Sequence, residues 1–391
     1  MVGNICLRQS FESMEKQKIA IIGGGIAGLT FSIALDPEKF ECHIFEKKEN
    51  FGEVGAAISV FPNALSVLKE LGMMDDILKT AGELKKIILK TAKGKTMSIT
   101  EPKGEFPILC IHRADLHAVL LKHSNAKLYE NHGISSIEEL PSNKMKLNFE
   151  NGESKEFDVV VGADGIHSVV RKYVINDGAP IFRGYNIWRG VIKTDFAIGH
   201  GSETMGKNQR VGIVPIKDGV YGWWATCNEE LMQDDEPEGT RNKLMRLFAG
   251  WHHPIPMFME KTEVIIKNSL SDRVPTKGWS KNNAVLIGDA AHPTTPNLGQ
   301  GGCTAIEGAY LLAKCIEKYG TTKTAYDRYE SLHFDRAKEI NQESLRLGKL
   351  GQLSNPILMA IRNLIFFLTP SSVSVKLLSK YFDRRVTKIE V

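Results

Sequence analysis

The chain has 391 residues, of which 42% are hydrophobic and 25% are charged, and its formal net charge is +4 at pH 7. This length is too great for one small core and suits two closely connected domains, and the composition is that of an ordinary soluble globular protein. The small net charge does not indicate nucleic acid as a partner.

The six cysteines lie far apart in the sequence and include no C-x-x-C pair. This spacing argues against a zinc ribbon and against a dithiol redox centre, and we predict reduced thiols, a cytoplasmic location and no metal site. Residues 1–17 contain no apolar core before a small-residue cleavage site, so we expect a disordered leader there rather than a signal peptide.

The first motif is "KIAIIGGGIAGLTFSIAL", in which a predicted strand over residues 19–22 leads into a predicted helix. Gly23, Gly25 and Gly28 between them fit G-x-G-x-x-G, where the glycines allow a tight turn, the approach of a pyrophosphate and close packing of helix on strand. Glu46 ends the next predicted strand, where a carboxylate can bind both hydroxyls of an adenosine ribose. The glycine pattern is weak alone, but this context predicts adenine-dinucleotide binding and leaves open which dinucleotide.

The second motif is "FDVVVGADGIHSVVRKY", a buried strand over residues 159–161, a turn that contains Asp164, and a short helix. Arg171 lies seven residues after Asp164, so it returns to a similar side of the helix two turns later. Alone, this segment favours an ordinary strand–turn–helix connection with Asp164 as a helix cap.

The third motif is "NNAVLIGDAAHPTTPNLGQGG", in which a strand over residues 284–287 delivers Asp289 at its carboxyl end, where open α/β sheets bind ligands. Pro293 and Pro296 stiffen the loop that follows. The next helix opens with bare main-chain amides, which suit developing negative charge. These helix-opening residues are Gly299, Gln300, Gly301 and Gly302.

Two side chains in this motif invite a catalytic interpretation. His292 is placed to act as a general base, but we favour a role in shaping the loop. Cys303 lies at a glycine-rich helix start, where its small size explains it without redox chemistry.

The three motifs, in this order, resemble the FAD-dependent class A monooxygenases, a family that includes p-hydroxybenzoate, salicylate and urate hydroxylases and zeaxanthin epoxidase. The resemblance extends from about Lys18 to Arg336. It implies that NADH or NADPH binds transiently and reduces FAD, that O2 adds at flavin C4a, and that the resulting hydroperoxide transfers one oxygen atom to a small aromatic or heteroaromatic molecule. The single G-x-G-x-x-G agrees with transient nicotinamide binding along a groove.

The resemblance also assigns residues to the cofactor. It implies that Arg113 contacts the ribityl and pyrophosphate region, that Asp164 serves both FAD and NAD(P)H, and that Asp289 binds the ribityl chain. The residues that it places at the ADP half of FAD are Gly23, Gly25, Ala27, Gly28, Glu46 and Lys47. The loop that it places at the flavin edge contains Pro296, Gly299, Gln300, Gly301 and Gly302.

We therefore expect an α/β fold, with a Rossmann-like FAD-binding domain built as three layers on a mostly parallel sheet. This domain is interleaved with a β-sheet-based substrate domain and followed by C-terminal helices. The segments expected for the FAD-binding domain are 18–84, 101–180 and 272–344, those for the substrate sheet are 85–100 and 181–271, and the C-terminal helical segment is 345–391.

The substrate sheet contains the motif W-R-G in "YNIWRGVI" and two predicted hairpins, with turns at residues 93–94 and 217–219. On the returning strand, Tyr221 and Trp223 share one face and Trp224 points the other way. Aromatic residues here serve a sheet core as readily as a substrate, and Arg210 reads either as a pocket cation or as a solvated strand-end arginine. The candidate substrate residues are Arg189, Arg210, Tyr221 and Trp223.

Two positions depart from the family pattern. Gly308 stands where the family usually has an aspartate, which affects helix packing. Asn297 stands where a urate hydroxylase is expected to carry an acid, which argues against urate as the substrate.

Alternative functions stay open at this stage. Within oxygen transfer, the alternatives are epoxidation and modification of a polyketide such as tetracycline. Outside it, they are a flavoprotein reductase and a non-catalytic FAD-binding protein; the halogenase pattern W-x-W-x-I-P is absent, because Trp223 and Trp224 are adjacent.

The C-terminal apolar run "PILMAIRNLIFFLTP" is interrupted by Arg362 and Asn363 and is shorter than the roughly 20 residues that span a bilayer. We expect this segment to close the pocket, with a peripheral membrane helix as the alternative. Membrane contact is not the favoured expectation, and the predicted oligomeric state is a monomer or homodimer.

Overall fold

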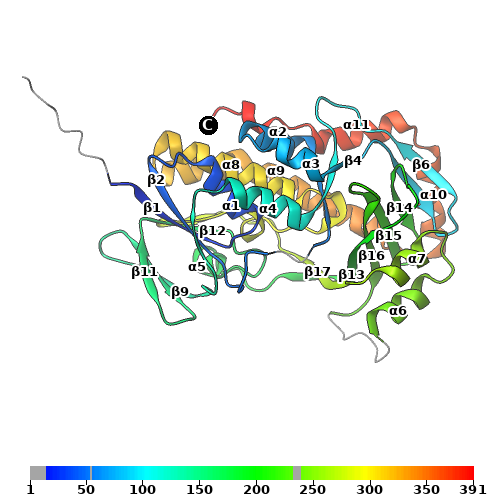
Figure 1. Cartoon of the computed structure of the whole chain (residues 1–391), viewed down its shortest axis with the longest axis horizontal. Helices are drawn as coiled ribbons and strands as arrows, with labels where there is room; N and C mark the ends of the chain where they lie inside the picture. Colours follow the sequence, from blue (N-terminus) through cyan, green and yellow to red (C-terminus); the bar gives the residue numbers. More distant parts are fainter. Residues whose placement is uncertain (1–14, 53–54, 232–238) are drawn as a thin grey trace, which may run out of the picture.

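The computed structural model describes residues 15–52, 55–231 and 239–391. Residues 1–14 of the predicted leader lie outside the described residues, and the first strand begins at Gln17. Four sheets carry the strands, and the predicted α/β class with a mostly parallel sheet and C-terminal helices is confirmed (Figure 1).

The first sheet has six strands in the order β18-β19-β12-β1-β2-β8. Every neighbouring pair is parallel except β18 with β19. Its central strands are short runs of valine, isoleucine and leucine that are buried on both faces, as parallel sheets covered by helices require. The strands are β1 (Gln17–Ile22), β2 (Phe40–Phe45), β8 (Lys127–Tyr129), β12 (Val159–Gly162), β18 (Ser280–Lys281) and β19 (Ala284–Leu286).

Helices cover this sheet, and α8 contacts α1, α2 and α9. The long helices α8 and α9 run side by side, so the residues after the third motif pack directly on the helix of the first motif. The helices around this sheet are α1 (Ile26–Ala34), α2 (Pro62–Glu70), α3 (Met74–Thr80), α4 (Arg113–His123), α5 (Val169–Val174), α8 (Gly301–Tyr319) and α9 (Lys323–Gly351).

Two small antiparallel sheets flank this core, in the orders β3-β7-β4 and β11-β10-β9. Their strands are β3 (Ala57–Val60), β4 (Gly82–Glu83), β7 (Leu109–His112), β9 (Ile134–Glu139), β10 (Met145–Phe149) and β11 (Ser154–Phe157).

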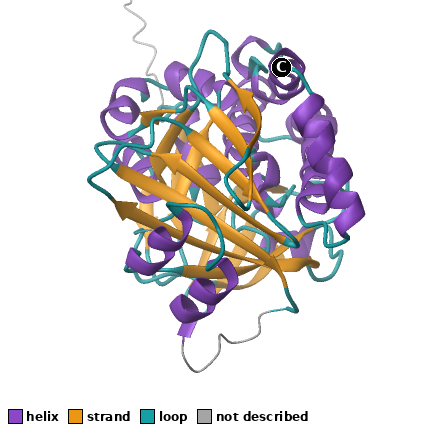
Figure 2. Ribbon diagram, turned by 90° about the vertical axis from the view of Figure 1, so that its right-hand side faces the viewer, coloured by secondary structure: helices purple, strands orange, loops and turns teal. Residues whose placement is uncertain are grey.

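The seven-stranded sheet has the order β17-β13-β16-β15-β14-β5-β6, and only β14 with β5 is a parallel pair. It brings the early hairpin β5–β6 beside strands that follow about a hundred residues later. Figure 2 shows the strands of the molecule lying among the helices. The strands are β5 (Ile87–Thr91), β6 (Thr96–Thr100), β13 (Ile181–Lys193), β14 (Gly201–Met205), β15 (Gln209–Pro215), β16 (Val220–Asn228) and β17 (Ile266–Asp272).

The two faces of this sheet have different neighbours. Its outer face carries Trp188, Tyr221 and Trp223 and packs in one apolar cluster with α6 (Gly239–Phe248) and α7 (Ile255–Lys261). Its inner face, which carries Arg210, Trp224 and Thr226, turns toward the FAD-binding side, because a Cβ added to Gly222 on that face would overlap the Cβ of Ala57 in β3. The inner face therefore meets β3.

The chain ends in α10 (Pro356–Leu368), α11 (Ser371–Phe382) and the short helix η3 (Val386–Lys388). Helices α10 and α11 both pack on β6, at the edge of the seven-stranded sheet. In the part of the chain that the structure describes, no single helix is long and apolar enough to cross a membrane. Glu307 of α8 is fully buried and lies 3.4 Å from both Arg336 of α9 and Arg384, so an ion-pair cluster fastens the C-terminal segment to α8.

Candidate active site

The first motif forms an open turn at the amino end of α1. Gly23 has a left-handed φ of 104°, and a Cβ there would overlap the carbonyl oxygen of Ala163, so only glycine fits. Gly25 caps α1 without a side-chain hydrogen bond, and a Cβ at this position would meet no atom within 4 Å. The amides of Gly23 and Gly24 bond within the protein, whereas the backbone at Gly25, where α1 begins, borders open space that a pyrophosphate could enter.

Glu46 lies beside this turn, at the carboxyl end of β2. Its carboxylate accepts hydrogen bonds from the backbone amides of Gly24 and Lys48, both at 3.1 Å. Lys47, the next residue, is exposed. The position of Glu46 next to the glycine turn fits a carboxylate that binds the ribose of a dinucleotide.

Asp164 of the second motif caps α5. One carboxylate oxygen accepts from the Ser168 hydroxyl at 2.5 Å, and the other accepts from the amides of Val169 at 2.7 Å and Val170 at 3.2 Å. Burial raises the pKa of Asp164, and these hydrogen bonds oppose that shift. The contacts present are those of the helix cap, which was the simpler interpretation of this segment.

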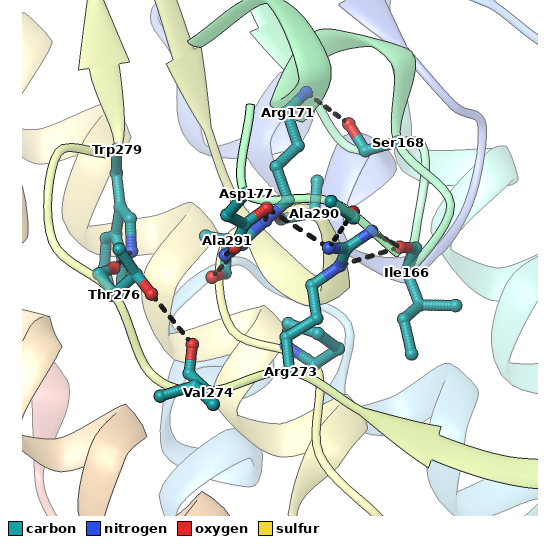
Figure 3. Close-up of polar contacts among 12 residues, drawn as sticks. Ile166, Ser168, Arg171, Asp177, Arg273, Val274, Thr276, Trp279, Ala290 and Ala291 are labelled. Atoms are coloured by element: carbon teal, nitrogen blue, oxygen red, sulfur yellow. Dashed lines mark hydrogen bonds and ion pairs between the residues drawn. The ribbon is translucent and has the colours of Figure 1, made fainter. Parts of the chain in front are cut away.

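Arg171 joins the second motif to the third (Figure 3). Its guanidinium is 1% exposed and donates to the carbonyl oxygens of Ala290 at 2.8 Å and Ala291 at 2.7 Å. Asp177 neutralises its charge through a 2.9 Å hydrogen bond to Nε, and Arg273 contacts the same carboxylate at 3.1 Å. The Arg171 guanidinium accordingly lowers the pKa of Asp177. This arginine fixes the loop that carries Asp289.

Asp289 lies in the turn that follows β19, next to the first motif. Its side chain is reached by solvent, yet the surrounding protein displaces enough water to raise the pKa of its carboxyl, while the positive charge of Arg113 lowers it. Gly288 has a left-handed φ of 58°, and a Cβ there would lie 2.7 Å from the Cβ of Ala27, so the first and third motifs touch at this point. Asp289 therefore lies near the amino end of α1, within electrostatic reach of Arg113.

The flavin-edge loop contains the short helix η2 (Pro296–Leu298) and leads into α8. Gly299 ends η2 with a φ of 70°, and α8 begins at Gly301 with no side-chain cap at Gln300. Gln300 is fully buried; its Oε1 accepts from Asn63 at 2.9 Å, whereas its Nε2 has no partner among the described residues. A Cβ at Gly302 would lie 2.8 Å from Ile58. A buried donor without an acceptor, beside uncapped helix amides, fits the polar edge of a flavin.

Together, these residues fit the successive parts of an FAD molecule. The glycine turn suits the pyrophosphate, Glu46 the ribose, Asp289 and Arg113 the middle of the molecule, and the start of α8 the flavin ring. When bound, FAD supplies the redox chemistry, and the chain supplies binding, orientation and electrostatics.

The surroundings of His292 do not suit a general base. Its ring packs against Trp279 and His333, with centroids 5.3 and 4.9 Å away, and burial lowers its pKa to about 4. The favoured role in shaping the loop agrees with this packing. Cys303 is buried as well, which raises the pKa of its thiol to about 12 and leaves it unreactive.

Tyr221 and Trp223, two of the candidate substrate residues, do not lie on the inner face of the sheet. Both lie on the outer face, where the amide of Ile198 donates to the Tyr221 hydroxyl at 2.7 Å and the Trp223 indole donates to Thr262 at 2.8 Å. The alternation of β16 was correctly predicted, but the sequence did not show which face turns inward. Trp224 and Tyr185 are aromatic residues of the inner face.

Arg210 lies on the inner face and is only 4% exposed, so the interpretation as a solvated strand-end arginine is wrong. Its guanidinium contacts Glu203 at 3.0 Å and the side-chain oxygen of Asn297 at 2.5 Å. It also donates to Gln352 at 3.2 Å. Arg210 therefore connects the substrate sheet, the flavin-edge loop and the end of α9.

Asn297 is fixed from both ends of its amide. Its oxygen accepts from Arg210, and its nitrogen donates to the hydroxyls of Tyr185 and Thr295, both at 2.8 Å. The sequence analysis did not select Tyr185, Glu203 or Gln352. Their signal is weak, since each is an ordinary polar residue whose partner is distant in sequence.

Two glycines in α9 make room for this network. A Cβ at Gly348 would lie 2.6 Å from the Asn297 amide nitrogen, and one at Gly351 would lie 2.5 Å from Arg210. Their spacing within "RLGKLGQ" was the available sequence signal.

Arg189 lies in β13 directly opposite Trp224 and donates to Asn268 at 2.5 Å. It is therefore on the inner face, nearer the edge strand β17 than Arg210 is. This position is compatible with a substrate role and does not assign one.

The fold and the residues that fit FAD are those of an α/β flavoprotein. The family model described as "FAD binding domain" matches residues 16–344. The chain belongs to this family.

Relatives with known activities support the same class. The chain is 33% identical over 354 residues to the aurachin C monooxygenase/isomerase of Stigmatella aurantiaca, covering 88% of this chain and 92% of that protein. It is 30% identical to the 3-amino-4-hydroxybenzoate 2-monooxygenase of Streptomyces cremeus, covering 85% and 87%. In fold, it is similar to Klebsiella pneumoniae HpxO complexed with FAD and uric acid, with a TM-score of 0.85, 23% identity, and coverage of 94% and 96%. The chain is an FAD-dependent monooxygenase.

Replacing Glu46 with alanine should weaken FAD binding at least about tenfold, because the ribose loses a charged hydrogen-bond partner. FAD retention after gel filtration and fluorescence titration of the apoprotein measure this effect. Glu49→Ala, an exposed neighbour, is the matched control. Equal FAD affinity in the Glu46 variant and the wild type would refute the role of Glu46.

Arg171→Met should destabilise the protein by about 3–5 kcal/mol, because Asp177 and two buried carbonyl groups lose their charged partner. Urea denaturation of the holoprotein measures the loss. Lys172→Met, at the exposed neighbouring position, should have little effect. If the two variants unfold alike, Arg171 does not hold the loop.

Stability should fall as the pH drops from 6.5 toward 4. The folded state keeps His292 neutral down to a pKa of about 4, while the unfolded chain protonates it near 6.5, so acid favours unfolding. His292→Phe should remove about 1.4 kcal/mol of this loss per pH unit in that interval. Denaturation series at several pH values test this, and identical pH profiles for the two proteins would contradict it.

Proposed function

We propose that this enzyme inserts one oxygen atom of O2 into an aromatic or heteroaromatic ring held between the flavin-edge loop and the inner face of the seven-stranded sheet. The observation that carries the proposal is the buried contact between Arg210 and Asn297, which joins the sheet to that loop. NADH or NADPH is the proposed electron donor. The related monooxygenases named above support the reaction class.

Each part of the site has a distinct task in this proposal. The amides at the start of α8 stabilise negative charge at the flavin edge, and Asp289 and Arg113 hold the cofactor in position. The inner face, with Trp224, covers the ring and excludes water. Arg210 donates a hydrogen bond that orients a polar substituent of the substrate.

The charges around Arg210 restrict the substrate. Glu203 already balances the guanidinium, and Asn297 adds a neutral amide where a urate hydroxylase is expected to carry an acid. We propose a substrate with an oxygen substituent that accepts a hydrogen bond, and we place urate outside the substrate range.

We also propose the domain division given above, a cytoplasmic location, and a monomer or homodimer in solution. The location is supported by the described cysteines, which are all buried and free. The domain division is supported by the placement of β5 and β6 in the same sheet as β13 to β17.

The direct test is a substrate screen with the FAD-loaded enzyme. Phenols, hydroxybenzoates, quinolones, purines and tetracyclines are supplied with NADH or NADPH, and NAD(P)H oxidation and product mass are followed. Stimulated oxidation with a product heavier by one oxygen atom supports the proposal. If no compound stimulates oxidation and none gains oxygen, the proposal fails; oxygenation of a tetracycline alone would favour the polyketide alternative.

With an identified substrate, Arg210→Met should raise KM at least about tenfold and leave FAD content unchanged, because Arg210 contacts the substrate side and not the ADP half. Steady-state kinetics and the flavin-to-protein absorbance ratio measure both effects. Lys207→Met, exposed and close to Arg210 in sequence, is the control. An unchanged KM would remove Arg210 from the substrate site.

A further inference from the structure

Helix α10 is amphipathic, but its charged residue is buried and its large apolar residues are exposed, which is the reverse of an ordinary surface helix. Its only charged residue, Arg362, is 2% exposed and donates to the carbonyl oxygens of Leu350 and Gly351 at the end of α9, both at 3.3 Å. Its large apolar side chains point outward instead, with Ile357 and Leu368 each 71% exposed. A helix on an aqueous surface normally has the opposite arrangement.

The exposed side chains form one stripe. Ile357, Ile361, Leu364 and Leu368 follow the spacing i, i+4, i+7 and i+11 and are between 49% and 71% exposed. Leu377 of α11 continues the apolar surface with 62% exposure. We call the outward surface of α10 and α11 the apolar C-terminal face. A contiguous apolar surface of this kind marks an interaction site.

The charges of this segment are of one sign. Residues 355–382 contain Arg362, Lys376 and Lys380 and no aspartate or glutamate; Arg362 is buried and Lys380 pairs with Glu339 of α9, so Lys376 is the exposed cation of the segment that has no acid in it to pair with. Lys95 of the neighbouring hairpin adds a further cation, since its ammonium lies 4.7 Å from the centre of the Phe367 ring. Apolar side chains accompanied by lysine and lacking acids are typical of helices that lie in the interface of an anionic bilayer.

The lengths of α10 and α11 distinguish a segment that spans a bilayer from one that lies on its surface. Helix α10 has 13 residues, or about 20 Å, which is shorter than the roughly 30 Å hydrocarbon core. Helix α11 continues at a bend of 102°, so the pair does not form one straight span. The segment therefore suits insertion parallel to the membrane plane.

A second copy of the chain fits less well. Lys380 is already paired with Glu339 of α9, but a symmetric dimer through this face would bring together two segments that each carry the exposed Lys376 and have no acid within residues 355–382 to pair with it. An anionic lipid surface supplies the missing negative charge.

We propose that the apolar C-terminal face docks the enzyme peripherally on anionic lipid bilayers. The inner end of α10 touches the active-site network, because Gly351, which accepts from Arg362, also packs against Arg210. Docking thus places the lipid surface next to the substrate side of the enzyme.

The test is co-sedimentation of the FAD-loaded protein with vesicles of phosphatidylcholine, with and without phosphatidylglycerol. We expect binding to the vesicles that contain phosphatidylglycerol, reduced at least about fivefold in high salt. Leu364→Asp combined with Ile361→Asp should reduce binding at least about tenfold. Leu78→Asp, an exposed leucine on α3, should bind as the wild type does.

FAD content and the unfolding temperature verify that each variant is folded. Absence of wild-type binding to anionic vesicles overturns the proposal, as does equal binding by the double variant. Light scattering tests the other occupant: if the wild type is a dimer that the α10 substitutions dissociate, and no vesicle binding occurs, the face is a dimer interface and the proposal is wrong.

Discussion

The active site depends on one buried cation. Arg171 is surrounded by protein, and two main-chain carbonyl groups and the carboxylate of Asp177 replace the water that it loses. Its partners follow β12 and β19, which are neighbours in the parallel sheet. The turns that follow β12 and β19 must therefore keep a fixed position relative to each other, and the proposed FAD site lies between them.

A second network, centred on Arg210, fixes the proposed substrate side of the site, just as Arg171 fixes the loop that carries Asp289. Arg210 and Asn297 connect an antiparallel sheet to a loop of the parallel unit, and α9 leaves them space through Gly348 and Gly351. Both networks place an arginine where main-chain or amide oxygens from distant segments converge. Rigid positioning of the reacting ring relative to the flavin edge is what such contacts provide.

The cofactor half of the molecule was readable from the sequence because each motif is local. In the first motif, the strand, the glycine turn and the following helix all lie within residues 17–34, and their order sets the geometry. The substrate half could not be predicted in the same way. Alternation along β16 shows that Trp223 and Trp224 face opposite ways, but it does not show which of the two faces turns toward the flavin. That choice depends on α6, α7 and β3, which are far away in sequence. The two interpretations of Arg210 stayed open for the same reason: its partners Glu203, Asn297 and Gln352 come from three separate segments.

The order of the strands has a consequence for biosynthesis. The central strand β1 is flanked by β12, and β12 by β19, so the parallel sheet is complete only after residue 286 has been made. The hairpin β5–β6 likewise waits for β14 before it gains its parallel neighbour. Neither unit can close while the ribosome is still in the first half of the chain, and such long-range pairing slows folding. FAD insertion is thus a late event, and nascent chains spend much of their synthesis with unpaired strand edges that chaperones must protect.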